Sequence, residues 1–260
     1  MEFSGRVAQV GPGVDPALLG RRVCAIVGGG AQATLVRVPA AHLIELPDDV
    51  AMNEAGGFAE AFITAYDALV LQGRLGFGER LLVSGAAGGV GAAAVQIGHL
   101  LGAHVIAVTR SRAHHQSLRD LGADDVILLE DVAHIDRVDV VLELVGAAHL
   151  QLAQNRLAPF ARIVVIGVAG GGSRADVNLL NIMQTRATLT GSTLRSRGDE
   201  EKSEVIARVT EALVAPWSRG EITVPLAATF DIEDVDDAYE YFATPGKFGK
   251  VLLATGPRER

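Results

Sequence analysis

The feature that most constrains this 260-residue chain is a glycine-rich turn between a strand-like and a helix-like segment. Residues 81–91 read LLVSGAAGGVG, so Gly85, Gly88 and Gly91 are three positions apart. Glycine lets the backbone pass close to a pyrophosphate, and the start of the next helix offers N–H groups and a favourable dipole. A second strand-like segment follows at residues 104–109, as in a βαβ dinucleotide-binding unit. A turn used only for tight packing is the alternative, but this context favours a nicotinamide dinucleotide.

The end of that second strand indicates which dinucleotide binds. A site for NAD usually places Asp or Glu there to hold the ribose 2′-hydroxyl, whereas residues 109–112 read TRSR. Arg110, Ser111 and Arg112 offer two guanidinium groups and a hydroxyl to a 2′-phosphate, unless both arginines are simply solvated. The pair 114–115 is His-His, whose side chains point in different directions on a helix and therefore do not suit one metal ion. The pattern predicts NADPH.

Strand-like and helix-like segments alternate through the middle of the chain, which predicts an α/β fold with a doubly wound parallel sheet. Strands are expected at residues 80–84, 104–109, 126–129, 138–144, 162–167 and 187–191, and helices at residues 89–101, 111–121, 147–157 and 179–184.

The two ends of the chain have a different pattern, mainly of short strands broken by glycine. Strands are expected at residues 2–10, 21–27, 33–38, 228–231 and 250–254, the first three as antiparallel structure, and helices at residues 54–71, 201–217 and 233–242. No linker separates independent domains.

Composition excludes several classes of partner. The net charge of −8 without a basic stripe argues against nucleic acid and against an anionic membrane surface. Neither a signal peptide nor a membrane span is visible, so the cytoplasm is the expected location. The single cysteine, Cys24, is expected to be an inert core thiol.

The sequence offers no pattern for a metal site or a covalent nucleophile. A structural zinc lobe needs four thiolates, and the other histidines are scattered. Glu60 and Glu143 are expected near the cleft. Glu143 ends a buried strand, where it either steers the nicotinamide ribose or has a hydrogen-bonded structural role. No catalytic residue is assigned.

Further motifs make the chain resemble a known family. They read EFSG at 2–5, VGPGV at 10–14, EAFITAY at 60–66, LGAD at 121–124, GSTLRSR at 191–197 and GKV at 249–251. With the glycine turn, they resemble medium-chain dehydrogenases/reductases of the zinc-independent quinone oxidoreductase branch. The run at 191–197 is similar to the p53-inducible quinone oxidoreductase subgroup.

The resemblance implies a Rossmann NADP-binding domain at residues 56–201 and a GroES-like, mainly β catalytic domain at residues 1–55 and 202–260. It also implies NADPH, a homodimer joined through the Rossmann domain, and hydride transfer to a quinone or activated enone. Its motifs assign cofactor contacts to Thr64, Ala87, Gly88, Gly89, Val90, Arg110, Ser111, His114, Val145, Gly146, Ile166, Gly167, Ser192 and Leu194.

Departures from the family pattern leave two other functions open. Relatives have a further segment before the position of Glu2, so the catalytic domain is expected to be N-terminally truncated and turnover to be impaired. His114 and Leu129 stand where relatives often have Lys and Tyr, and residues 32–35 read QATL. The alternatives are a non-catalytic NADPH-binding protein, acting as a sensor or partner subunit, and an enoyl-reductase type module.

Overall fold

The computed structural model describes residues 1–170 and 172–256. Its contacts divide the chain into two units, Met1–Ile63 with Leu194–Arg260 (unit 1) and Thr64–Thr193 (unit 2). The sequence placed these divisions at 55/56 and 201/202. The first division lies at 63/64 instead, because Phe58 stacks on Trp217 with ring centroids 3.9 Å apart, and on Phe62 at 4.5 Å. These aromatic contacts keep the start of the following helix within unit 1.

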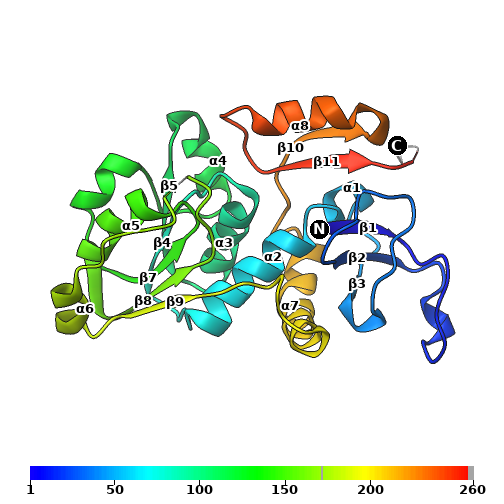
Figure 1. The fold of residues 1–260 in the computed structure, drawn as a ribbon, viewed down its shortest axis with the longest axis horizontal. Coiled ribbons are helices and arrows are strands. Elements are labelled where there is room, and N and C mark those ends of the chain that lie inside the picture. The colour runs from blue at the N-terminus through cyan, green and yellow to red at the C-terminus, as the bar shows by residue number, and fades with distance from the viewer. Residues whose placement is uncertain (171, 257–260) are drawn as a thin grey trace. The chain divides into compact units, whose positions relative to one another are not determined.

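Unit 2 is built on a six-stranded parallel sheet with the strand order β6-β5-β4-β7-β8-β9 (Figure 1). The strands are β4 (Arg80–Val83), β5 (His104–Thr109), β6 (Asp125–Leu128), β7 (Val138–Glu143), β8 (Leu157–Val165) and β9 (Thr188–Gly191). The helices are α3 (Gly89–Leu100), α4 (His115–Asp120), α5 (Ala147–Ala153) and α6 (Leu179–Thr185), with short turns η4 (Arg112–His114), η5 (Leu129–His134) and η6 (Gln154–Arg156). The predicted doubly wound Rossmann sheet is confirmed.

The core of unit 2 explains why its strands read as continuous apolar runs. Leu82, Ile106, Val141 and Ile163 come from four neighbouring strands, and none is more than 1% exposed. A parallel sheet is covered on both faces, so its strands do not alternate between apolar and polar residues.

Unit 1 contains two small sheets. The antiparallel sheet has the order β1-β2-β3, with strands β1 (Glu2–Arg6), β2 (Arg22–Ile26) and β3 (Leu43–Glu45); β10 (Leu226–Asp231) and β11 (Lys250–Ala254) form a parallel pair. The helices are α1 (Met52–Ala55), α7 (Asp199–Ser218) and α8 (Val235–Ala243), with short turns η1 (Pro16–Leu18), η2 (Ala40–His42) and η7 (Ile232–Asp234).

The strand predicted at residues 33–38 is wrong. This segment has no ladder partner in the structure, and its Leu35 side chain is 77% exposed. The third strand is β3, which pairs with β2 through Cys24 opposite Ile44. Both segments contain apolar residues, and only the tertiary fold selects which one reaches β2.

The helix predicted at residues 54–71 is broken into three parts, α1, α2 (Ala59–Tyr66) and the π-helix η3 (Asp67–Gln72). The first break falls at Gly56 and Gly57. A Cβ atom on Gly57 would lie 2.9 Å from Val224 Cγ1, so the chain turns where only glycine fits. In the part of the chain that the structure describes, no helix combines the length and the apolar character needed to cross a membrane.

Candidate dinucleotide-binding site

The glycine turn lies where the sequence places it, between β4 and α3. Gly85 has φ of +60°, a conformation that favours glycine, and Gly88 is the N-cap residue of α3 without a side-chain cap. A Cβ atom on Gly91 would lie 2.4 Å from the Gly85 carbonyl oxygen. The first N–H groups of a helix have no partner within it, so this tight turn presents donors suited to a phosphate.

The sheet topology gathers most of the predicted cofactor residues at one edge. From β4 the order runs through β5 and β6 in one direction and through β7, β8 and β9 in the other. Ligands of such sheets bind beyond the carboxyl ends of the strands at this switch point. After β4 lie Ala87, Gly88, Gly89 and Val90; after β5 lie Arg110, Ser111 and His114; after β7 and β8 lie Val145, Gly146, Ile166 and Gly167; after β9 lies Ser192. Leu194 belongs to unit 1 and is buried there.

The segment after β5 is a basic cluster without a carboxylate. Arg110 and Arg112 are exposed, and Ser111 caps η4 by accepting a hydrogen bond from Ala113 N–H at 3.2 Å. Burial of its ring lowers the pKa of His115, and the charges of Arg119 and Arg112 lower it further. These neighbouring cations give the segment a positive potential that suits a phosphate group.

Asp67, which the sequence reasoning missed, contacts the predicted cofactor residue Ser192 and follows another, Thr64. The Ser192 hydroxyl donates to Asp67 Oδ2 at 2.7 Å, and Asp67 is 2% exposed. Thr64 precedes Asp67 by one helical turn, so both lie on the same face. The signal available in the sequence was an acid three residues after Thr64 in an otherwise apolar segment.

Glu143 has the structural role that the sequence left open, rather than a direct contact with a ribose. Its side chain is 0% exposed and its Oε2 lies 2.5 Å from His149 Nδ1. Its Oε1 accepts a hydrogen bond from the Ser84 hydroxyl at 3.0 Å. Sequence reasoning missed Ser84 and counted His149 only among the scattered histidines, because a pairing across two strands leaves no local pattern.

Glu60 is placed within unit 1 and takes part in an ion cluster. Lys250 Nζ contacts Glu2 Oε1 and lies 3.5 Å from Glu60 Oε2, while Glu60 N–H donates to Glu2 Oε2 at 2.8 Å. The single cysteine, Cys24, also lies in unit 1. It is 0% exposed, and burial raises the pKa of its thiol far above the ordinary value. The prediction that this thiol lies in the core is confirmed.

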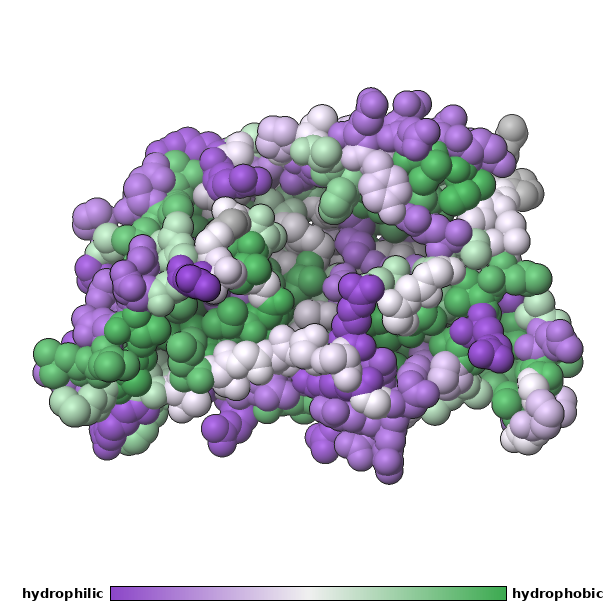
Figure 2. Space-filling view, viewed as in Figure 1, coloured by the Kyte–Doolittle hydropathy of each residue, from purple (hydrophilic) through white to green (hydrophobic). Residues whose placement is uncertain are grey.

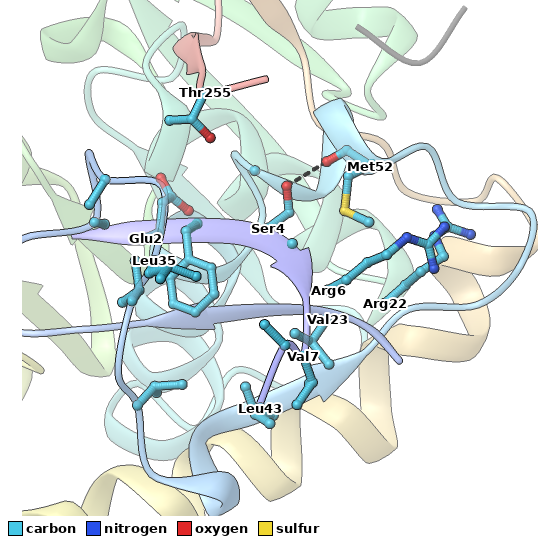
Figure 3. A pocket seen from close by; sticks show the side chains of 18 of the residues that line it. Glu2, Ser4, Arg6, Val7, Arg22, Val23, Leu35, Leu43, Met52 and Thr255 are labelled. Atoms are coloured by element: carbon cyan, nitrogen blue, oxygen red, sulfur yellow. Dashed lines mark hydrogen bonds between the residues drawn. The ribbon is translucent and has the colours of Figure 1, made fainter. Parts of the chain in front are cut away.

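Unit 1 also contains a groove of about 1860 Å³ along β1, the loop at residues 31–40 and β11 (Figure 3). Ser4 in its wall donates a hydrogen bond to the Met52 carbonyl at 2.6 Å, and Leu35 lies at its edge. The lining combines apolar side chains with Arg6 and Arg22, so the groove offers a mixed surface.

Comparisons with known proteins agree with this architecture. The family described as zinc-binding dehydrogenase matches residues 89–211. The chain is 32% identical to the polyketide synthase GfsB of Streptomyces halstedii over 98% of its own length, but it spans only 4% of that protein. It is 28% identical to the synaptic vesicle membrane protein VAT-1 homolog of Homo sapiens, covering 100% of this chain and 71% of that one. It is 29% identical to the quinone oxidoreductase-like protein 2 of Bos taurus, covering 98% and 75%.

A solved structure connects the fold to a cofactor. Mycobacterial Rv1454c complexed with NADPH matches with a TM-score of 0.86 and 25% identity, covering 98% of this chain and 81% of that one. The chain belongs to the medium-chain dehydrogenase/reductase superfamily, in its quinone oxidoreductase branch. The matches support an oxidoreductase that uses a nicotinamide cofactor. Within residues 1–170 and 172–256, no group of three or more His, Cys, Asp or Glu side chains is arranged to hold a metal ion.

The turn of this medium-chain dehydrogenase/reductase fits the pyrophosphate of such a cofactor. A Cβ atom at Gly88 would have only the Gly85 carbonyl oxygen, at 3.5 Å, within 4 Å, so the N-cap position of α3 is not crowded. The first turn of α3 contains no acidic residue that would repel a phosphate.

Proposed function

We propose that this protein is an NADPH-dependent oxidoreductase that transfers hydride to a quinone or an activated enone without a metal ion. The observation that carries the proposal is the glycine turn at the switch point of the sheet, next to Arg110 and Arg112 and without a carboxylate after β5. An anionic cofactor with a 2′-phosphate suits these groups better than one with a free ribose hydroxyl.

The proposed roles follow from the positions of the residues. Gly88 and Gly89 hold the pyrophosphate at the start of α3, while Arg110 and Ser111 hold the adenosine phosphate. Thr64 and Ser192 face the nicotinamide side, and Ser192 is held by its hydrogen bond to Asp67. The cofactor supplies the hydride when bound, and the chain orients it and excludes water.

A quinone suits a site with so few chemical groups. It is electron-poor and becomes aromatic on reduction, so it needs little help from a Lewis acid. An unactivated carbonyl would need a metal ion to polarise it.

Two rival functions differ from this proposal. One is a non-catalytic NADPH-binding protein, and the other is an enoyl reductase with the same fold. The solved CurK enoyl reductase shares the fold with a TM-score of 0.82 at 22% identity.

Steady-state oxidation of NADPH distinguishes these functions. The protein is expected to oxidise NADPH with 1,2-naphthoquinone faster than with a crotonyl thioester, and elemental analysis of the same sample should find no stoichiometric zinc. Binding of NADPH without turnover of either acceptor would favour the sensor or partner subunit. A faster rate with the thioester would favour the enoyl-reductase module.

We also propose that the chain forms a homodimer through unit 2. Strand β9 is an outer strand of the six-stranded sheet, and large apolar side chains beside it are exposed: Phe160 57%, Leu179 75%, Leu180 58%, Met183 67% and Leu189 43%. Figure 2 shows hydrophobic side chains gathered over α6. An apolar patch beside an open sheet edge is typical of a surface that pairs with another chain.

Sedimentation velocity is the direct test of this interface. The wild type is expected to sediment as two chains, and the double variant Leu180→Glu/Met183→Glu as one chain, because it places charge in the apolar patch. Leu35→Glu is the matched control, since Leu35 is similarly exposed but lies in unit 1. A monomeric wild type, or a double variant that remains dimeric, would contradict the proposal.

A further inference from the structure

A buried hydrogen-bond network joins the two strands at the centre of the candidate site. It consists of Ser84, Glu143 and His149, with exposed fractions of 0%, 0% and 1% (the Glu143 network). Ser84 directly follows β4 and Glu143 ends β7, the two neighbouring strands at which the strand order reverses direction. The network therefore bridges the point where the two halves of a dinucleotide-binding sheet meet.

Three groups donate hydrogen bonds to Oε1 of the Glu143 carboxylate, and His149 Nδ1 faces its Oε2. Oε1 accepts from Val145 N–H at 2.7 Å and from Gly146 N–H at 2.8 Å, in addition to the Ser84 hydroxyl. That hydroxyl itself accepts from Leu144 N–H at 2.6 Å, so its own hydrogen is available to Glu143. Three donors on one oxygen stabilise the ionised form of Glu143, and a carboxylate in turn requires that His149 Nδ1 carries a hydrogen.

The electrostatics agree with this protonation state. Burial raises the pKa of Glu143, but the hydrogen bond and charge of His149 and the two backbone N–H groups outweigh it, leaving that pKa below its ordinary value. An ionised carboxylate with four donors fixes its surroundings more strongly than a neutral group would.

The segment held by Glu143 touches the other loops of the site. A Cβ atom on Gly85 would lie 3.3 Å from Val145 Cγ2, and one on Gly167 would lie 2.9 Å from the Leu144 carbonyl oxygen. Gly170 N–H donates to the Val145 carbonyl at 2.9 Å. Residues 144–146 are thus packed between the glycine turn after β4 and the loop after β8, and any displacement is passed to both.

His149 contributes through one of its two nitrogens. Its Nδ1 contacts Glu143, whereas its Nε2 is buried and has no hydrogen-bond partner among the described residues. An unsatisfied buried nitrogen destabilises the folded state, so packing alone does not explain an imidazole at this position. Its Nδ1–H donor to Glu143 is the contact that accounts for it.

We propose that Glu143 and His149 are positioning residues for the nicotinamide half of the cofactor. They hold residues 144–146 in the conformation that the site requires, without touching the cofactor themselves. This inference rests on the proposed function, because it assumes that the carboxyl edge of unit 2 binds NADPH. It adds two buried residues to a site whose other members lie mainly in the loops after the strands.

Two substitutions at one position separate positioning from packing. His149→Leu keeps an apolar side chain of moderate size but removes the donor. His149→Asn keeps an N–H group near the position of Nδ1 and removes the unsatisfied Nε2. The affinity of each variant is measured by titration calorimetry for NADPH and for adenosine 2′,5′-bisphosphate, which occupies only the adenosine half.

His149→Leu is expected to weaken NADPH binding by about tenfold or more, because misplaced contacts lose binding energy steeply. Its affinity for adenosine 2′,5′-bisphosphate should stay within about twofold of the wild type, since Arg110 and Arg112 follow a different strand. His149→Asn should restore NADPH binding. Parallel loss of both ligands, or equal NADPH binding by all three proteins, would overturn the inference. A wild type that binds neither ligand would overturn the proposed function and this inference together.

Discussion

NADPH is expected to bind at least about tenfold more tightly than NADH, and the double variant Arg110→Ala/Arg112→Ala should lose that preference. A hydrogen bond to a charged group contributes about 1.5–3 kcal/mol, which corresponds to a tenfold or greater difference in affinity. Both arginines follow β5 in an exposed position, and no carboxylate is present there to hold a free 2′-hydroxyl. Titration calorimetry with the two cofactors measures the ratio directly.

The matched control for the cofactor preference is Arg208→Ala. Arg208 is an exposed arginine on α7 in unit 1, so its loss changes the net charge without altering the segment after β5. This variant should keep the wild-type ratio. Equal affinities of the wild type for NADPH and NADH, or an unchanged ratio in the double variant, would show that the two arginines do not bind a 2′-phosphate.

Gly91→Ala should destabilise the protein strongly, although alanine favours helices. Alanine in a helix is normally about 1 kcal/mol better than glycine. Here the added Cβ atom would lie 2.4 Å from the Gly85 carbonyl oxygen and 2.6 Å from Ala86 Cα, and backbone atoms cannot move aside easily. We expect a loss of about 1–3 kcal/mol in the free energy of unfolding, or about 2–4 °C in Tm for each kcal/mol.

Gly88→Ala is the control that separates folding from cofactor binding. Its Cβ atom would meet only the Gly85 carbonyl oxygen at 3.5 Å, an ordinary contact, so thermal unfolding should resemble that of the wild type. Its NADPH affinity should fall, because the methyl group stands where the pyrophosphate approaches the helix N-terminus. A Gly91→Ala variant that unfolds at the wild-type temperature would contradict the tight turn, and unchanged NADPH binding by Gly88→Ala would contradict the pyrophosphate site.

The sequence by itself determined the Rossmann unit and the position of its glycine turn. Strand β5 has the predicted bounds, and β4, β7 and α3 differ from them by one residue at their ends. This success has a physical cause. Parallel strands buried on both faces need continuous apolar runs, and a glycine turn needs residues without a Cβ atom, so both leave local patterns.

Only the tertiary structure decided the features that depend on residues far apart in the chain. The sequence offered residues 33–38 as the third strand, but in the structure β3 pairs with β2. The aromatic stack of Phe58 on Trp217 places the first division between the units after Ile63. The Glu143 network was equally hidden, because Ser84 and Glu143 are 59 positions apart. A hydrogen bond between neighbouring parallel strands requires no sequence periodicity, and a buried carboxylate can be interpreted only when its donors are known.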